Sequence, residues 1–160
     1  MLPEEVTNFI GTCGEVKIHE VEKGAIKKFA DAVGDSNPLY WDDEYARNSR
    51  YGSIIAPPGF FGWPTRWEIG STQPPALDTI DRVRVAIGKA GYPRRLAGGI
   101  EYELFIPIRA GDTLAASPMV KDIVELEGGT GKLVLLIIET TYINQNGDVV
   151  AKSRVTSINR

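Results

Sequence analysis

A chain of 160 residues with a net charge of −3 is long enough for one domain and too short to divide comfortably into two. Its charges are scattered, without a basic stripe interleaved with aromatic residues, so no nucleic acid partner is expected. No apolar run approaches the roughly 18 to 20 residues that cross a bilayer, and the N-terminus lacks an export signal pattern. The single cysteine, Cys13, fits a reducing compartment, and we expect a cytoplasmic protein with no membrane partner.

The first third of the chain predicts a strand followed by two helices. Residues 16–21 alternate between apolar and polar side chains, which is typical of a strand. Residues 22–34 repeat apolar side chains at helical spacing and end at Gly34, a common residue just after a helix. An Asn-Pro turn then leads into a short helix that we expect around 42–49.

The middle of the chain carries mixed signals. Four apolar side chains follow one another at helical spacing, namely Ala56, Phe60, Trp63 and Trp67. They predict a helix that begins near a proline pair and is ended or kinked by Pro64, which removes a backbone donor. Residues 71–97 have few periodic cues, so we expect a long excursion containing one short helix or strand.

From Gly98 onward the pattern is that of β-structure. Alternating segments predict four strands, over residues 100–106, 113–126, 132–143 and 148–158. "NQNG" at 144–147 is a strong hairpin signal between the last two. "LVLLII" at 133–138 is apolar on both faces, as expected of a central strand covered by a helix on one side and by a partner on the other.

This order of elements predicts an α+β fold in a single domain over residues 1–160. A strongly curved antiparallel sheet wrapped around one apolar, kinked helix fits it. Such a layer leaves a sheet face or edge exposed, so we expect a dimer.

Several common kinds of site are not predicted. His19 is the only histidine and lies in an alternating stretch far from Cys13, so it fits a strand face better than a metal site. There is no glycine loop of the P-loop or dinucleotide type. We therefore expect no metal and no cofactor.

Two segments together resemble a known family. "FADAVGDSNPLYWDDEYARNSRYGSIIAPPGFF" and the later "GGIEYELFIPIRAGDTL" are similar to the MaoC-like, (R)-specific enoyl-thioester hydratases and dehydratases, most closely to the N-terminal-type MaoC domain. The resemblance covers most of the chain, with 71–97 matched least. It implies a hot-dog fold, which is a curved sheet around a central helix in a dimeric arrangement.

The resemblance also implies a chemistry. In active members, an Asp and a His in a Gly-Asp-x-Asn-Pro-x-His segment hold the water that adds to a trans-2-enoyl thioester, or leaves in the reverse reaction. Histidine suits this role because it exchanges a proton near neutral pH. A backbone N–H within an Ala-His-Gly stretch, at the start of the central helix, holds the thioester oxygen.

This sequence keeps only part of that pattern. Asp35 matches the family's aspartate and Asn37 belongs to the matching turn, but Tyr40 occupies the histidine's place. A tyrosine with its ordinary pKa near 10 is a poor substitute for imidazole. Ala56-Pro57-Pro58 replaces Ala-His-Gly, and Pro58 has no N–H to donate.

The two losses favour a non-catalytic, acyl-binding subunit of a hetero-oligomeric 2-enoyl-CoA hydratase or dehydratase. The ligand would be an acyl-CoA or an acyl carrier protein thioester. The partner would be a homologous MaoC-like catalytic subunit, in a hot-dog dimer or a dimer of dimers. Two alternatives stay open: a self-sufficient homodimeric hydratase that uses Asp35, and a regulatory protein that senses acyl-CoA without turnover.

Each candidate residue also has a structural explanation. Asp35 is either a remnant of the catalytic base or a cap of the Asn-Pro turn, which Asn37 also holds, and Tyr40 is either a weak acid or a packing residue. The candidates for contact with the acyl group are Asn37, Pro58, Gly59, Phe60 and Trp63. Their aromatic members fit ordinary core equally well. A further group, Lys89, Arg94 and Arg95, would meet CoA phosphates or form a solvated basic loop.

Overall fold

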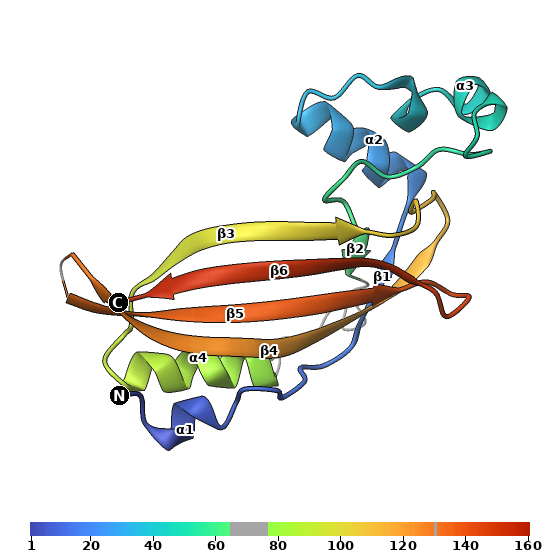
Figure 1. The fold of residues 1–160 in the computed structure, drawn as a ribbon. Helices are drawn as coiled ribbons and strands as arrows, with labels where there is room; N and C mark the ends of the chain where they lie inside the picture. Colours follow the sequence, from blue (N-terminus) through green and yellow to red (C-terminus); the bar gives the residue numbers. More distant parts are fainter. Residues whose placement is uncertain (65–76, 130) are drawn as a thin grey trace, which may run out of the picture.

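The computed structural model describes residues 1–64, 77–129 and 131–160. The helices are α1 (Glu4–Thr7), α2 (Lys23–Ala32), the 3-10 helix η1 (Pro38–Tyr40), α3 (Asp43–Asn48) and α4 (Thr79–Lys89). The strands are β1 (Lys17–Glu20), β2 (Trp63–Pro64), β3 (Arg95–Leu104), β4 (Thr113–Gly128), β5 (Gly131–Ile143) and β6 (Val149–Asn159). They form one curved antiparallel sheet in the order β2-β1-β4-β5-β6-β3 (Figure 1). No helix within the described ranges is long and apolar enough to cross a membrane.

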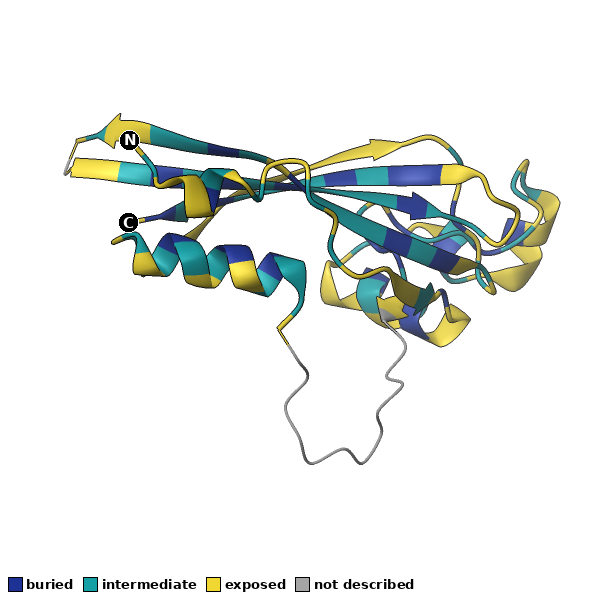
Figure 2. Ribbon diagram, turned by 90° about the horizontal axis from the view of Figure 1, so that it is seen from below, coloured by how far each residue is buried: buried dark blue, intermediate teal, exposed yellow. Residues whose placement is uncertain are grey.

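Helix α4 covers one face of the sheet, with α1 beside it (Figure 2). It presents Ile80, Val83 and Ile87, spaced three and four residues apart, to the buried side chains of β4 and β5. Asp78 starts the helix by accepting a hydrogen bond from the Asp81 N–H at 2.8 Å. The partners of the helix on the sheet are Val120, Ile123, Val134, Leu136 and Ile138.

A second core lies at the other end of the sheet. There α2, η1 and the segment 54–61 pack on the ends of β4, β5 and β6. Ile26 and Ala30 supply the buried face of α2, as the helical spacing of 22–34 predicts. The candidate site is built into this second core.

Most of the predicted elements are confirmed. The strand at 16–21, the helix at 22–34, the short helix near 42–49 and the four later strands all occur with small shifts of their ends. The excursion at 71–97 holds more regular structure than predicted, because α4 occupies eleven residues of it and β3 already begins at Arg95. Residues 71–76 lie outside the described part of the chain.

The kinked helix through residues 56–64 is wrong. Pro57 and Phe60 close a turn through a 3.0 Å hydrogen bond from the Phe60 N–H to the Pro57 carbonyl. Pro58 and Gly59 hold its central positions, and Gly59 has φ +88°, the arrangement of a type II turn. Turn chemistry therefore overrides the helical spacing, and Trp63 pairs with β1 as a strand. Trp67 falls outside the described residues, and α4 covers the sheet in place of the expected kinked helix.

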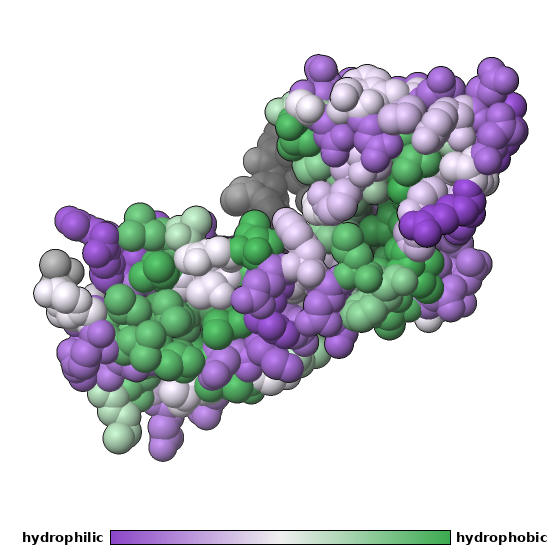
Figure 3. Space-filling model, turned by 45° about the horizontal axis from the view of Figure 1, so that its top comes forward, coloured by the Kyte–Doolittle hydropathy of each residue, from purple (hydrophilic) through white to green (hydrophobic). Residues whose placement is uncertain are grey.

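The central strand β5 is apolar on both faces, as predicted. Val134, Leu136 and Ile138 are buried under α4. Leu133, Leu135 and Ile137 point to the opposite face and are partly exposed. The cross-strand neighbours of Leu135 and its row are also apolar, namely Leu96, Val124 and Ile158. Figure 3 shows hydrophobic side chains gathered over part of the sheet. Coverage of this face by a partner stays a prediction.

The two faces of β5 should respond differently to truncation. Leu136→Ala should lower the free energy of unfolding by about 3 kcal/mol because it opens a cavity in a closed core. Leu135→Ala, the matched control on the opposite face, should cost about 1 kcal/mol in the isolated chain, because its side chain is already partly exposed. Urea unfolding followed by circular dichroism measures both. Equal losses would contradict a core on one side of the sheet.

Candidate functional site

A cavity of about 360 Å³ lies where η1, the turn at 57–60 and the segment after β3 meet. Its walls are mostly apolar, with Ile55, Leu104 and Ile106 among them. Five of the residues singled out in the sequence line it, and they come from two separate segments. These are Asn37, Tyr40, Pro58, Gly59 and Phe60.

Gly59, in the type II turn, lines this cavity and carries a backbone N–H. Pro58 has no N–H, as the sequence predicts, but the Gly59 N–H makes no hydrogen bond within the described ranges. Only glycine fits this position comfortably, because its φ is +88° and a Cβ would lie 3.3 Å from Tyr102 Cε2. The donor expected to be lost at Pro58 is thus present one residue later.

Asp35 is engaged in the Asn-Pro turn. Its Oδ1 accepts a hydrogen bond from the Asn37 N–H at 3.0 Å, and the Asn37 Oδ1 accepts from the Leu39 N–H at 3.1 Å. The Trp41 indole N–H donates to the Asp35 carbonyl oxygen at 2.9 Å. Asp35 is not among the residues that line the cavity. Its contacts are those of a turn-capping residue.

Tyr40 is buried in the second core and lines the cavity. Burial raises the pKa of its phenol above the ordinary value of 10.0, and the charges of Asp35 and Tyr51 raise it further. The side chain therefore stays neutral at pH 7 and is a weaker proton donor than an exposed tyrosine. This environment is the reverse of one that would adapt a tyrosine to replace imidazole.

The two aromatic candidates differ in position. Phe60 is buried, lines the cavity and packs against Phe29, with ring centroids 5.2 Å apart. Trp63 is 57% exposed and meets Phe60 edge-on at 5.5 Å, outside the cavity lining. The position of Trp63 therefore does not support its predicted contact with the acyl group in this cavity.

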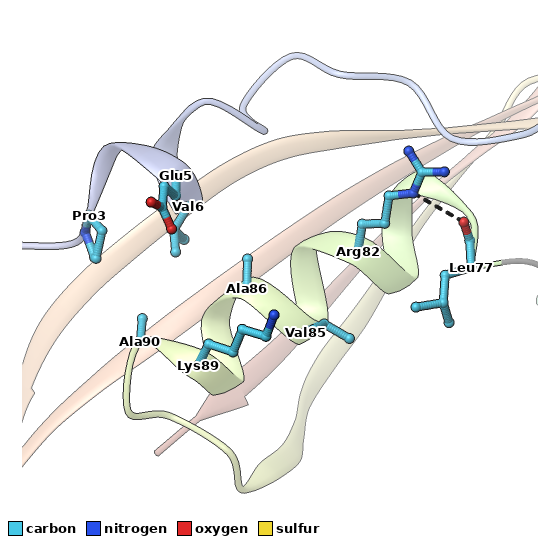
Figure 4. Close-up of a pocket in the computed structure, with 9 residues that line it drawn as sticks. All are labelled: Pro3, Glu5, Val6, Leu77, Arg82, Val85, Ala86, Lys89 and Ala90. Carbon is cyan, nitrogen blue, oxygen red and sulfur yellow. Dashed lines mark hydrogen bonds between the residues drawn. The ribbon is translucent and has the colours of Figure 1, made fainter.

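The three basic candidates lie away from the cavity. Lys89 lines a separate groove between α1 and α4, with Glu5 and Arg82 nearby (Figure 4). Arg94 and Arg95 lie at the start of β3, and the other end of that strand, Leu104, lines the cavity. Ten strand residues separate these ends by about 30 Å. The structure of one chain does not bring these cations together with the cavity.

An aromatic wall behind the cavity was missed in the sequence. Phe61 lines the cavity and stacks on Tyr142, with ring centroids 4.3 Å apart and an interplanar angle of 16°. Its carbonyl oxygen accepts a hydrogen bond from His19 Nδ1 at 3.2 Å. These residues come from the turn segment, β5 and β1. Phe61 does not belong to the row of apolar side chains from which the helix over 56–67 is predicted. No local signal reveals the contact.

Comparison with known proteins places the chain in a family. A family model described as "FAS1-like, dehydratase domain region" matches residues 8–153. A UPF0336 protein of Streptomyces avermitilis is 37% identical over 113 residues, which cover 69% of this chain and 67% of that protein. A "Probable enoyl-CoA hydratase alpha subunit" of Thermomonospora curvata is 27% identical over 132 residues, which cover 81% of this chain but only 41% of that protein.

The solved structures agree on the fold. A chain in the crystal structure of the ChsH1-ChsH2 complex from Mycobacterium tuberculosis superposes with a TM-score of 0.78 at 20% identity. The superposition covers 97% of this chain and 86% of that one. The hot-dog fold and the resemblance to MaoC-like hydratases and dehydratases are thereby confirmed.

The capping role of Asp35 can be measured directly. Asp35→Ala should lower the free energy of unfolding by about 1 kcal/mol, because the Asn37 N–H loses its acceptor. Asp31→Ala is the matched control, since Asp31 is exposed on α2 and should not lower it. Chemical unfolding followed by tryptophan fluorescence gives both values. An unchanged stability of Asp35→Ala would contradict the capping role.

Proposed function

Because the chain belongs to the family of FAS1-like dehydratase domains, we propose that it is the acyl-binding, non-catalytic subunit of a hetero-oligomeric 2-enoyl-CoA hydratase or dehydratase. The observation that carries the proposal is the buried, neutral Tyr40 in a cavity where active members have a histidine. The catalytic Asp and His would then belong to a homologous partner subunit. The names of the similar proteins, a hydratase alpha subunit and a two-component complex, support the same arrangement.

The cavity has the features that binding of a thioester needs. Its walls are largely apolar, and the Gly59 N–H is a donor that a carbonyl oxygen could accept from. The proline pair restricts the turn, so little conformational freedom is lost when the donor is used. Binding therefore needs no contribution from Asp35 or Tyr40 as acid or base.

A second candidate function also has an observation in its favour. If the Gly59 N–H acts as the oxyanion donor, only the imidazole is missing from the family's catalytic set. A self-sufficient homodimeric hydratase that uses Asp35 would then need another proton donor. The local engagement of Asp35 and the raised pKa of Tyr40 both weigh against it.

The edge strand β3 offers a surface for the partner subunit. All ten of its residues are exposed, and within the described part of the chain only one of its two sides is paired, with β6. Ile100 and Tyr102 pair with Val155 and Ser153, so their side chains lie on the same face of the sheet as α4. Helix α4 packs on β4 and β5 and leaves this face of β3 uncovered by the helix. A long, open edge with apolar side chains on one face is what a second sheet would extend by antiparallel pairing.

The division of labour predicts the behaviour of the purified chain. Alone, it should bind crotonyl-CoA and longer enoyl-CoA without forming 3-hydroxyacyl-CoA. Mixed with a MaoC-like subunit that retains its Asp and His, it should support hydration, and Tyr40→Phe should change that rate by less than about twofold. Absorbance of the enoyl thioester follows the reaction. Turnover by the chain alone that Asp35→Ala abolishes would overturn the proposal in favour of the second candidate.

The proposed interface predicts that a lysine on β3 weakens assembly with the partner subunit, whereas a lysine elsewhere on the surface does not. Ile100→Lys should weaken assembly with the partner subunit at least tenfold, because it places a charge on the β3 edge. Val33→Lys is the control, since Val33 at the end of α2 is 58% exposed and Ile100 is 57% exposed. Size-exclusion chromatography with light scattering measures assembly. An equal effect of both changes, or of neither, would contradict an interface at β3.

A further inference from the structure

A second cavity, of about 270 Å³, lies between the first turns of α4 and the face of the sheet on which α4 packs. Its floor is apolar, with Ile80 from the helix and Ile138 and Val155 from the sheet. His19, Thr140 and Tyr142 add polar groups to its lining. None of these residues lines the first cavity.

The stacked rings of Phe61 and Tyr142 lie between the two cavities. Its ring forms part of the lining of the first cavity and stacks on Tyr142, which lines the second. The Phe61 carbonyl oxygen accepts the hydrogen bond from His19, which also lines the second cavity and meets Tyr142 edge-on at 5.9 Å. Tyr102 also packs against Phe61, with ring centroids 5.3 Å apart. Among the described residues, the partition is thus a stacked pair of aromatic rings, with Phe61 on the side of the first cavity and Tyr142 on the side of the second.

The second cavity suits the uncharged end of an acyl chain. His19 donates through Nδ1 to Phe61, and burial lowers the pKa of its imidazole, so the ring is neutral at pH 7. The charged groups in the lining form ion pairs, Lys17 with Asp78 at 3.6 Å and Arg84 with Asp81 at 3.2 Å, while the buried Arg84 Nε has no partner among the described residues. An apolar floor with neutral hydrogen-bonding groups offers methylene groups a place to be buried.

We infer that Phe61 is a specificity-determining residue, which sets how deeply an acyl group can enter the chain. This inference rests on the proposed function, because it takes the first cavity as the thioester site. With Phe61 in place, an acyl group ends at its ring. A small residue at position 61 extends the first cavity to the Tyr142 ring, which borders the second cavity, and a longer acyl group then buries more of its methylene groups.

The test compares acyl-CoA binding across chain lengths by calorimetry. Wild-type chain should bind butyryl-CoA, and its affinity should stop rising once the acyl group reaches Phe61. Phe61→Ala should raise the ratio of lauroyl-CoA affinity to butyryl-CoA affinity at least tenfold over that of wild type, since each further buried methylene is worth about fourfold. Phe61→Leu should raise the acyl chain length at which affinity stops rising by a smaller amount. This variant keeps most of the packing and serves as the test if Phe61→Ala does not fold.

Phe29→Ala is the matched control. Phe29 packs against Phe60 in the same core, yet it lines neither cavity, so its loss should not change the dependence on chain length. If butyryl-CoA does not bind to the wild type, the proposed function fails. If butyryl-CoA binds to the wild type but the ratio of lauroyl-CoA affinity to butyryl-CoA affinity in both Phe61 variants equals that of wild type, the inference about Phe61 fails alone.

Discussion

The pairing of β4 with β5 is the constraint on which the rest of the structure depends. It runs from Ala115 opposite Ile143 to Gly128 opposite Gly131, with one register shift between Val120 and Asp122. A slip by one residue would move Val134, Leu136 and Ile138 to the opposite face and leave α4 without an apolar partner. The same pairing sets Tyr142 at the far end of β5, where it meets Phe61. The ladder thus determines both where the helix lies and how the candidate site is closed.

The sequence predicts those parts of the fold that depend on local pattern. Strict alternation identifies the strands, and apolar spacing with a terminal glycine identifies α2. The failures are also local conflicts. Around residues 56–64 the helical spacing of bulky side chains predicts a helix, whereas the backbone preferences of Pro-Pro-Gly favour the turn that forms. In α4 the apolar spacing of Ile80, Val83 and Ile87 and the Asp78 cap were real signals, but the nearby proline pair obscured them.

The candidate site is predictable to a different degree. The capping of the Asn-Pro turn by Asp35 follows from residue type alone, and the structure has that contact. The free N–H of Gly59 does not follow, because family comparison directs attention to Pro58, one position earlier. The raised pKa of Tyr40 and the wall at Phe61 depend on segments far apart in the chain, which meet only when the sheet forms. Neither the pKa of Tyr40 nor the wall at Phe61 can therefore be predicted from the local sequence pattern.

The turn at 57–60 changes the electrostatic character of the site as well as its geometry. In the family's arrangement the donor stands at a helix N-terminus, where aligned peptide dipoles add roughly half a positive charge. Gly59 belongs to no helix, so its N–H offers a direction for a hydrogen bond without that accumulated field. Such a group can orient a resting carbonyl, but it gives little extra attraction as negative charge builds up on the oxygen. Under the proposed function, such a scaffold would hold the reactant in place and leave the lowering of the barrier to the partner subunit.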